Sequence, residues 1–409
     1  MFIVKTIKET TKIINDNFSS YNLLKINIKV EDALNYVCAI DIYSTEDVPH
    51  FDRSIVDGYA VDFNSVKLAS SATPAILINI GSVEMGEASK YSVKDDNTVY
   101  IPTGGHLPRG ANSVVMIENT DTLGEEIIIN KSVSIYENVL RKGTDILEGS
   151  IVIKKNTLIT PLVIGALKSL GINKISVYKK LDVTLISTGD EIVENKVTLK
   201  IGEIRDINTY TIENLLKNKF ITVNDKAIIS DNFDYYKAYI LKGFENSDVV
   251  ITSGGSSVGD KDYTLAILKD IGAEILVHGI NIKPGKPTII AKYNGKLFLG
   301  LPGQPTSAFF VLNTFINDII NSIYNINNIY PTPYIEARLT LNVHSVSGRR
   351  LYQLVKIEFN EENELIAIPL FAKSGMINSL KEASGYIIID ELSEGSLANM
   401  VVKVYRLGD

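Results

Sequence analysis

An alternation of strand and helix patterns between residues 178 and 328 constrains the fold more than any other feature of this chain. Short apolar runs alternate there with segments of helical periodicity, as in a parallel α/β domain. The expected strands are Val183–Ser187, Ile221–Ile229, Asp248–Thr252, Ile275–Val277, Thr288–Ala291 and Lys296–Leu301. The expected helices are Asn208–Lys217, Asp234–Gly243, Tyr263–Ile271 and Ser307–Tyr324. In the last of these, the polar residues recur at helical spacing and indicate one solvated face; they are Asn313, Asn317, Asp318 and Asn321.

The sequence on either side of this region has a different texture. Residues 1–45 carry apolar residues at helical spacing, with a second such set over Val30–Ile40. Residues 141–177 hold another helix signal, in which Thr160 is the N-cap and Pro161 occupies the first helical position. We expect these two segments to form one discontinuous helical domain.

Two further regions are rich in β-strand patterns. Residues 46–140 contain short β-branched runs separated by Gly, Pro, Asn and Asp, which predicts an all-β module. Residues 329–409 begin with two prolines, Pro331 and Pro333, and then carry about five β runs, which predicts a small β-barrel or sandwich. The expected architecture is therefore a multidomain α/β protein of four domains, with residues 178–328 as its α/β domain.

Composition excludes several classes of protein. The chain of 409 residues has 41 Lys plus Arg against 48 Asp plus Glu, and this net charge of -7 disfavours a nucleic-acid binder. The single Cys38, on a predicted apolar helix face, excludes a disulfide framework and a cysteine zinc site. Neither a spanning apolar segment nor a signal-peptide core is visible. We expect a cytoplasmic protein that binds no membrane.

Three of the expected strands run directly into polar loops that contain glycine. Such loops open at the carboxyl edge of a parallel sheet, where ligands bind, and their glycines let backbone N–H groups approach a phosphate. One loop of this kind can be a simple turn, but three together predict a site for a phosphate-bearing ligand. The expected lining residues are Ser187, Thr188, Gly189, Asp190, Asp206, Asn208, Ser253, Gly254, Gly255, Ser257, Gly259, Asp260, Pro302, Gly303 and Pro305.

Two common nucleotide sites are disfavoured. The spacing from Gly254 to Gly259 imitates a P-loop, but Asp260 stands where the lysine of that motif belongs. The chain also lacks a G-x-G-x-x-G motif after a strand, which disfavours a nicotinamide-dependent dehydrogenase.

The same loops carry charge of both signs. Their carboxylates would repel a phosphate unless a hard cation bridged the two, which implies Mg²⁺. The alternative is that acids such as Asp190 and Asp260 are caps and solvated turns. Lys283 and Lys286 are flanked by prolines and suit an oxyanion, although a solvent-facing lysine pair in a turn explains them equally well.

Eight segments in order resemble those of one enzyme family. They are FDRSIVDGYAV, IPTGGHLPRGANSVVMIE, RKGTDI, STGDEIV, GEIRDINTY, SGGSSVGDKDYT, IKPGKP and LPGQPTSA. The family is the molybdopterin molybdenumtransferases, whose eukaryotic counterparts include the carboxyl-terminal domain of gephyrin. The resemblance runs from about residue 30 to the C-terminus.

This resemblance implies a reaction and an assembly. The reaction is insertion of molybdate into adenylylated molybdopterin, with release of AMP and formation of molybdenum cofactor. The assembly is an elongated homodimer of four-domain subunits with active sites built from both chains, and a molybdopterin adenylyltransferase is the expected upstream partner.

The resemblance also implies roles for single residues. The catalytic group would comprise Asp57, Thr103, Glu191, Asp231 and Asp262, with Thr103 supplied by the partner chain. Glu191 and Asp262 are the expected Mg²⁺ ligands, directly or through water. The residues bordering molybdate and the pterin phosphate would be Lys283, Lys286, Pro302, Pro305, Arg350 and Ser379. The sequence does not identify a general base.

The chain departs from the family pattern at three places. Gln304 and Thr306 replace the usual Asn and Val, and Leu354 stands where relatives commonly place a second Arg. Two alternatives remain open: a non-catalytic paralogue that binds molybdopterin or acts as a scaffold, and the same chemistry with tungstate. A nucleotide hydrolase is weaker, because the P-loop lysine is missing.

Overall fold

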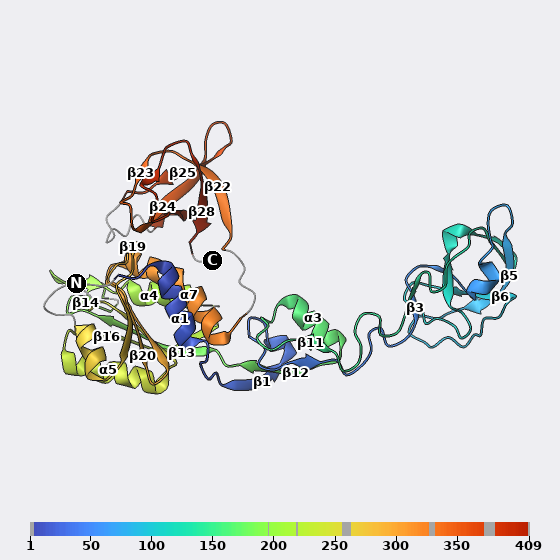
Figure 1. Cartoon of the computed structure of the whole chain (residues 1–409), viewed down its shortest axis with the longest axis horizontal. Helices are drawn as coiled ribbons and strands as arrows, with labels where there is room; N and C mark the ends of the chain where they lie inside the picture. The colour runs from blue at the N-terminus through green and yellow to red at the C-terminus, as the bar shows by residue number, and fades with distance from the viewer. Residues whose placement is uncertain are drawn as a thin grey trace. The chain divides into compact units, whose positions relative to one another are not determined.

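The computed structural model describes residues 4–194, 196–217, 220–255, 263–326, 332–371 and 381–407 (Figure 1). The chain forms two compact units. The first comprises Met1–Ala39, Asn156–Ile164 and Lys174–Asp409, and the second comprises Ile40–Lys155 and Gly165–Asn173. Within the described residues, no helix is both long and apolar enough to cross a membrane.

A six-stranded sheet forms the centre of the first unit. Its strand order is β16 (Ile221–Ile229), β13 (Leu181–Thr188), β17 (Val249–Ser253), β21 (Lys296–Leu301), β20 (Ile289–Tyr293) and β18 (Glu274–His278). The first four strands are parallel, as expected, but β20 is antiparallel to both of its neighbours. The reason is a two-residue turn, Asn294-Gly295, in which both residues have positive φ and β20 and β21 form a hairpin.

Helices cover both faces of this sheet. On one face lie α4 (Asn208–Leu216) and α7 (Pro305–Tyr324), which share one apolar cluster with strands β13, β17 and β21. On the other face, a second cluster contains residues of α5 (Phe233–Asn246) and α6 (Tyr263–Asp270). The four predicted helices of this domain are therefore confirmed.

The first helix of the chain packs against α7 (Figure 1). Helix α1 (Ile7–Phe18) begins with a capping box, in which Thr6 and Glu9 satisfy each other's backbone N–H groups. It buries Ile14 and Phe18 completely in the α7 cluster, and each of these side chains contributes about 1.5–3 kcal/mol to stability.

The polar residues of α7 are not simply solvated. Asn313 Nδ2 donates to the Tyr386 hydroxyl at 3.0 Å, and Asp318 accepts a hydrogen bond from Thr11 at 2.5 Å. Burial raises the pKa of Asp318 above its ordinary value. Of the four predicted solvated residues only Asn317 is exposed. Asn313 and Asp318 contact the C-terminal barrel and α1, and Asn321 is half-buried.

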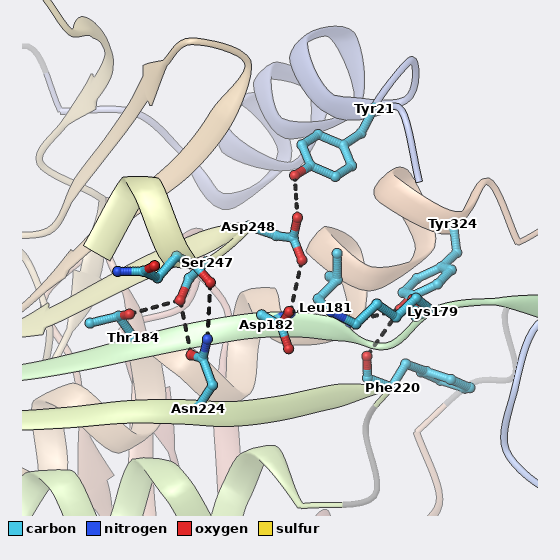
Figure 2. A network of polar contacts seen from close by, with 11 residues as sticks. Tyr21, Lys179, Leu181, Asp182, Thr184, Phe220, Asn224, Ser247, Asp248 and Tyr324 are labelled. Atoms are coloured by element: carbon cyan, nitrogen blue, oxygen red, sulfur yellow. Dashed lines mark hydrogen bonds and ion pairs between the residues drawn. The ribbon is translucent and has the colours of Figure 1, made fainter. Parts of the chain in front are cut away.

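A hydrogen-bond network closes the amino edge of the sheet (Figure 2). The Tyr324 hydroxyl accepts from the Leu181 N–H at 3.1 Å and lies 3.0 Å from two carbonyls, those of Lys179 and Phe220. Asp248 accepts from the Tyr21 hydroxyl at 2.6 Å and from the Asp182 N–H at 2.8 Å. Thus the segment after α1, the end of α7 and the starts of three strands are joined at this edge.

The network continues through neutral side chains, of which Thr184 and Ser247 are buried. The hydroxyls of Thr184 and Ser247 are hydrogen-bonded at 2.7 Å, and the Ser247 hydroxyl donates to Asn224 Oδ1 at 2.9 Å. Burial raises the pKa of both Tyr21 and Tyr324, and hydrogen bonding to Asp248 adds to the shift of Tyr21.

The segment after α1 is extended. Strand β1 (Lys25–Lys29) pairs with β12 (Lys174–Tyr178), and β1 is followed by one turn of 3₁₀ helix, η1 (Val30–Asp32). The helix expected over Val30–Ile40 is therefore wrong. Asn35 adopts a left-handed backbone with φ of 61°, which a helix cannot contain, and Cys38 is buried in an extended segment bridged to Val177.

The helix predicted after Thr160 is confirmed as α3 (Pro161–Ser169).

The second unit is β-rich, as expected. Its main sheet has the order β7 (Ser113–Met116), β4 (Gly58–Val61), β6 (Asn97–Ile101), β5 (Ala75–Ser82), β9 (Glu126–Ile129) and β8 (Thr120–Leu123). Its smaller elements are β2 (Ile42–Tyr43) with β11 (Ile151–Ile153), β3 (Arg53–Ser54) with β10 (Val139–Leu140), the short helix α2 (Phe63–Val66) and the 3₁₀ turn η2 (Ile117–Asn119).

The C-terminal region is a closed five-stranded barrel, one of the two forms expected. Its strands are β22 (Tyr334–Leu339), β24 (Arg350–Phe359), β25 (Leu365–Pro369), β26 (Gly385–Ile389) and β28 (Val401–Arg406), and the β24–β26 pairing closes it. A short strand, β19 (Ile282–Lys283), adds to β24 in parallel. The remaining pairs are β14 (Ile192–Val193) with β15 (Ile204–Arg205), and β23 (Val343–His344) with β27 (Gly395–Ser396).

Candidate functional site

The topology places a switch point between β13 and β17. The chain leaves β13, passes through α4 to β16 at the sheet edge, and returns through α5 to β17 on the opposite side of β13. In sheets of this kind, ligands bind at the carboxyl ends of the strands where the direction of winding reverses. The loops after β13 and β17 are the two that border this point.

Glycines allow three loops to meet at the switch point. Gly254 has φ of 99°, and a Cβ there would lie 2.3 Å from the Thr188 carbonyl oxygen, so no other residue fits. The Gly254 N–H donates to the Leu301 carbonyl at 3.2 Å, and a Cβ on Gly303 would lie 3.5 Å from the Gly254 Cα. The loops after β13, β17 and β21 are therefore in contact. Ser257, Gly259, Asp260 and Asp262 lie outside the described residues.

Three acids gather at the ends of β13 and β16. Thr188 Oγ1 donates to Asp231 Oδ1 at 2.8 Å, and the Asp231 N–H donates to Asp190 Oδ1 at 3.0 Å. The Glu191 carboxylate folds back over Gly189, where an added Cβ would lie 2.8 Å from Glu191 Oε2. In the part of the chain that the structure describes, no three His, Cys, Asp or Glu residues are already arranged to hold a metal.

Asn208 joins two of the loops through its amide nitrogen. Its Nδ2 donates to Ser253 Oγ at 2.6 Å and to the Gly303 carbonyl at 2.8 Å. Asp206 precedes it, and Asp206 Oδ1 accepts from Ser187 Oγ at 3.3 Å and from the backbone N–H of Thr209 at 3.2 Å. These contacts fix the start of α4 against the switch point.

Three buried oxygen atoms near the strand ends lack a partner among the described residues. They are Asn208 Oδ1, Thr252 Oγ1 and Thr306 Oγ1. A buried polar atom without a hydrogen bond costs about 1–3 kcal/mol, so native proteins rarely keep one without a use. Asn208 and Thr306 each adjoin the Pro302–Gln304 loop. The sequence predicted a role for Asn208. It gave no reason to expect one for Thr252, and it marked Thr306 only as a departure from the family pattern.

The predicted lysine loop lies at the same edge. It connects β18 to β20, and β18 runs parallel to β21, so the loop begins at the carboxyl edge. Hydrogen bonds shape it: the Ile280 N–H donates to the Lys286 carbonyl at 2.9 Å, and Thr288 Oγ1 donates to the Gly285 carbonyl at 2.8 Å. Lys283 and Lys286 thus add positive charge to the edge that carries the acids.

Arg350 reaches this edge from the barrel. Arg350 pairs with Ile282 in the β19–β24 register, and the backbone N–H of Arg350 donates to the Asn281 carbonyl at 3.3 Å. Leu354 of the same strand is buried in the apolar cluster shared with α7, so in this chain that position serves packing. Ser379 lies outside the described residues.

Asp57 and Thr103 belong to the second unit. Asp57 Oδ1 accepts both the backbone N–H of Thr103, at 2.8 Å, and its hydroxyl, at 3.1 Å. The structure therefore brings these two predicted residues together, at the start of β4 and directly after β6.

Three family models match the chain in order. Residues 5–171 match the MoeA N-terminal region (domain I and II), residues 184–322 a probable molybdopterin-binding domain, and residues 336–407 the MoeA C-terminal region (domain IV). The chain is also 30% identical to the molybdopterin molybdenumtransferase of Haemophilus influenzae over 89% of both chains. It belongs to the molybdopterin molybdenumtransferase family.

Other members of the molybdopterin molybdenumtransferase family show the same extent of similarity. The enzyme of Staphylococcus aureus is 30% identical and covers 97% of this chain and 94% of its own length. The crystal structure of a molybdopterin biosynthesis moeA protein from Pyrococcus horikoshii has a TM-score of 0.82 at 27% identity, covering 98% of this chain and all of its own. The predicted resemblance to this enzyme family of molybdenum cofactor biosynthesis is confirmed.

Proposed function

We propose that this chain inserts molybdate into adenylylated molybdopterin, releasing AMP and forming molybdenum cofactor. The supporting observation is the meeting of three loops at the switch point, beside a loop with two lysines. Membership of the molybdopterin molybdenumtransferase family gives that site its substrate class.

The residues at the switch point suit such a ligand. The backbone of Gly254 and Gly255 can approach a phosphate because it carries no side chain. Asn208 Oδ1 is an unused acceptor, and the N–H groups of a pterin ring are donors. Lys283 and Lys286 would attract molybdate or the pterin phosphate to the same edge. These contacts hold the substrate in place and orient it for the reaction.

The acids at the site fit Mg²⁺. Mg²⁺ in proteins usually takes one or two carboxylates and completes its shell with water and substrate phosphates, so a ready-made protein cage is not required. Glu191 would hold it, together with Asp262, and the metal would offset negative charge on the phosphates. Thr188 and Asp190 would keep Asp231 oriented beside them, through the hydrogen bonds to its carboxylate and its N–H.

Asp57 and Thr103 complete the proposal in a homodimer, in which the partner subunit supplies them to the site. The substrate would come from a molybdopterin adenylyltransferase, and the protein would act in the cytoplasm. The division into four domains, 1–45 with 141–177, 46–140, 178–328 and 329–409, belongs to the same proposal. Sedimentation velocity tests the homodimer, since a strict monomer contradicts a shared site.

The reaction is tested by incubating the protein with adenylylated molybdopterin, Mg²⁺ and molybdate and measuring AMP. We expect AMP from the unaltered protein and little from Glu191→Gln. A matched control is Glu245→Gln near the end of α5, which removes the same charge away from the carboxyl ends of the strands. Absence of AMP from the unaltered protein, or equal AMP from Glu191→Gln, contradicts the proposal and favours a non-catalytic scaffold.

The choice of metal oxyanion needs a separate assay. Molybdate and tungstate have the same charge and nearly the same geometry, so the site residues do not distinguish them. Repeating the AMP assay with each anion over a concentration series gives the preferred substrate directly.

A further inference from the structure

Arg350 and Asp390 form a cross-strand pair at one end of the C-terminal barrel. Strands β24 and β26 are antiparallel with Leu351 opposite Ile389, so Arg350 and Asp390 are the next pair in register. Their side chains lie 3.0 Å apart, between Arg350 Nη2 and Asp390 Oδ1. The Asp390 side chain is 71% exposed, and an ion pair this open to water contributes little to folding.

The guanidinium of Arg350 retains unused donor capacity. It carries five N–H groups, of which those of Nη2 are directed to Asp390. Its Nε is buried and has no acceptor among the residues that the structure describes. A buried donor without an acceptor is unfavourable, so the fold leaves part of the hydrogen-bonding capacity of this guanidinium unused.

Arg350 is also tied to the lysine loop. The backbone N–H of Arg350 donates to the Asn281 carbonyl. The Asn281 side chain in turn donates to the Gly348 carbonyl, just before β24. Lys283 lies two residues beyond Asn281. Arg350 thus belongs to the positive edge of the site, and Asp390 places a negative charge directly against it.

We propose that Asp390 lowers the affinity of the Arg350 surface for doubly charged oxyanions such as molybdate and tungstate. Its carboxylate occupies part of the guanidinium and repels an incoming anion, and the repulsion is twice as large for a dianion as for a monoanion. The identity of the oxyanion, molybdate or tungstate, rests on the proposed function. The effect of Asp390 is a property of the Arg350 surface and is measured without catalysis.

The test is the isosteric variant Asp390→Asn in the full chain. It keeps the shape and an oxygen acceptor but removes the charge. Titration calorimetry with tungstate and molybdate, without pterin, should show about fivefold tighter binding, equivalent to about 1 kcal/mol. In the AMP assay, the KM for molybdate should fall by the same factor while kcat changes less than twofold. The gain should shrink at high salt, since screening weakens the repulsion.

Glu394→Gln is the matched control, because it removes the same charge from the same barrel at an exposed position. We expect its oxyanion affinity to equal that of the unaltered protein. Equal or weaker binding by Asp390→Asn, or no detectable binding in either protein, overturns the inference. If Asp390→Asn melts at a lower temperature, Asp390→Ser provides a second uncharged variant.

The two proposals fail in different ways. Tighter oxyanion binding by Asp390→Asn in a protein that releases no AMP supports the role of Asp390 and contradicts the proposed reaction. Release of AMP with unchanged oxyanion affinity supports the reaction and contradicts the role of Asp390.

Discussion

The two edges of the central sheet use polar side chains in opposite ways. At the amino edge, the hydroxyls and carboxylates of Tyr21, Thr184, Ser247, Asp248 and Tyr324 all have hydrogen-bond partners (Figure 2). At the carboxyl edge, buried oxygens are left without partners in the described residues, and glycines adopt positive φ. Both edges belong to the same strands, and the unpartnered oxygens lie near the carboxyl ends, in β17 and at the starts of α4 and α7.

This contrast separates stability from function within one sheet. Satisfied hydrogen bonds at the amino edge stabilise the folded state, whereas unsatisfied groups at the carboxyl edge cost stability until a ligand pairs with them. Substitutions at the carboxyl edge should therefore change activity more than unfolding, and those at the amino edge should do the reverse.

The largest expected effect is at the carboxyl edge, from Asp231→Asn. The asparagine can still accept the Thr188 hydroxyl hydrogen bond, but the negative charge is lost. We expect AMP release to fall on the order of 100-fold, as when a polar group that stabilises a transition state is removed. The melting temperature should stay within a few degrees, as checked by thermal denaturation. A large loss of stability with normal activity would reverse the comparison.

The next effect is at the amino edge, from Tyr324→Phe. The change deletes a buried hydroxyl that contacts Leu181, Lys179 and Phe220, and we expect it to lower the free energy of unfolding by about 2 kcal/mol. Urea denaturation measures this. Tyr235→Phe on α5 is the control, because that tyrosine is 57% exposed and should change stability by less than about 0.5 kcal/mol. AMP release per folded molecule should be unchanged in both.

A smaller effect, with a characteristic pH dependence, is expected from Tyr21→Phe. Loss of the hydrogen bond to Asp248 should cost about 1 kcal/mol at pH 7. Burial and Asp248 raise the pKa of Tyr21 in the folded state above its ordinary value of 10.0, so the folded state holds the proton more tightly. This stabilisation is complete below pH 10.0 and is lost as the pH rises through the folded pKa. Denaturation at pH 8 and pH 11 should show a smaller alkaline loss in Tyr21→Phe than in the unaltered chain.

The smallest effect concerns the contact between α1 and α7, through Asp318→Asn. Burial raises the pKa of this carboxyl, so its charged form is penalised in the folded state. That penalty is present at neutral pH and disappears as the pH falls below the ordinary pKa. Asparagine keeps an acceptor for Thr11, so the variant should be more stable at pH 7 by about 0.5 kcal/mol or less. A loss of stability at pH 7 would show that the charge itself favours the contact.

The sequence predicted the α/β domain well because local patterns determine it. The bounds of β16 and β21 match the apolar runs Ile221–Ile229 and Lys296–Leu301, and each predicted helix there is present. The reversed direction of β20 was missed, although the Asn294-Gly295 turn was a readable signal. The helix expected over Val30–Ile40 was wrong because apolar spacing alone did not reveal the left-handed Asn35.

Contacts between distant residues were beyond the reach of these patterns. Tyr21 and Asp248 are separated by 227 positions, and nothing in either local sequence points to the other. The unpaired oxygen of Thr252 was equally invisible, because a threonine in a buried strand is ordinary. The lysine loop was predicted from its prolines, but its attachment to the barrel through Arg350 depends on the β19–β24 pairing.

The packing of α1 on α7 has a consequence for biosynthesis. Thr11 and its partner Asp318 are 307 positions apart, so the first helix made must wait for the last helix of the α/β domain. At roughly 5–20 residues per second, translation takes about 15–60 seconds to supply that partner. During that time the apolar face of Ile14 and Phe18 has no permanent cover. During synthesis the apolar face of α1 therefore stays without its native partner until almost the whole α/β domain has left the ribosome.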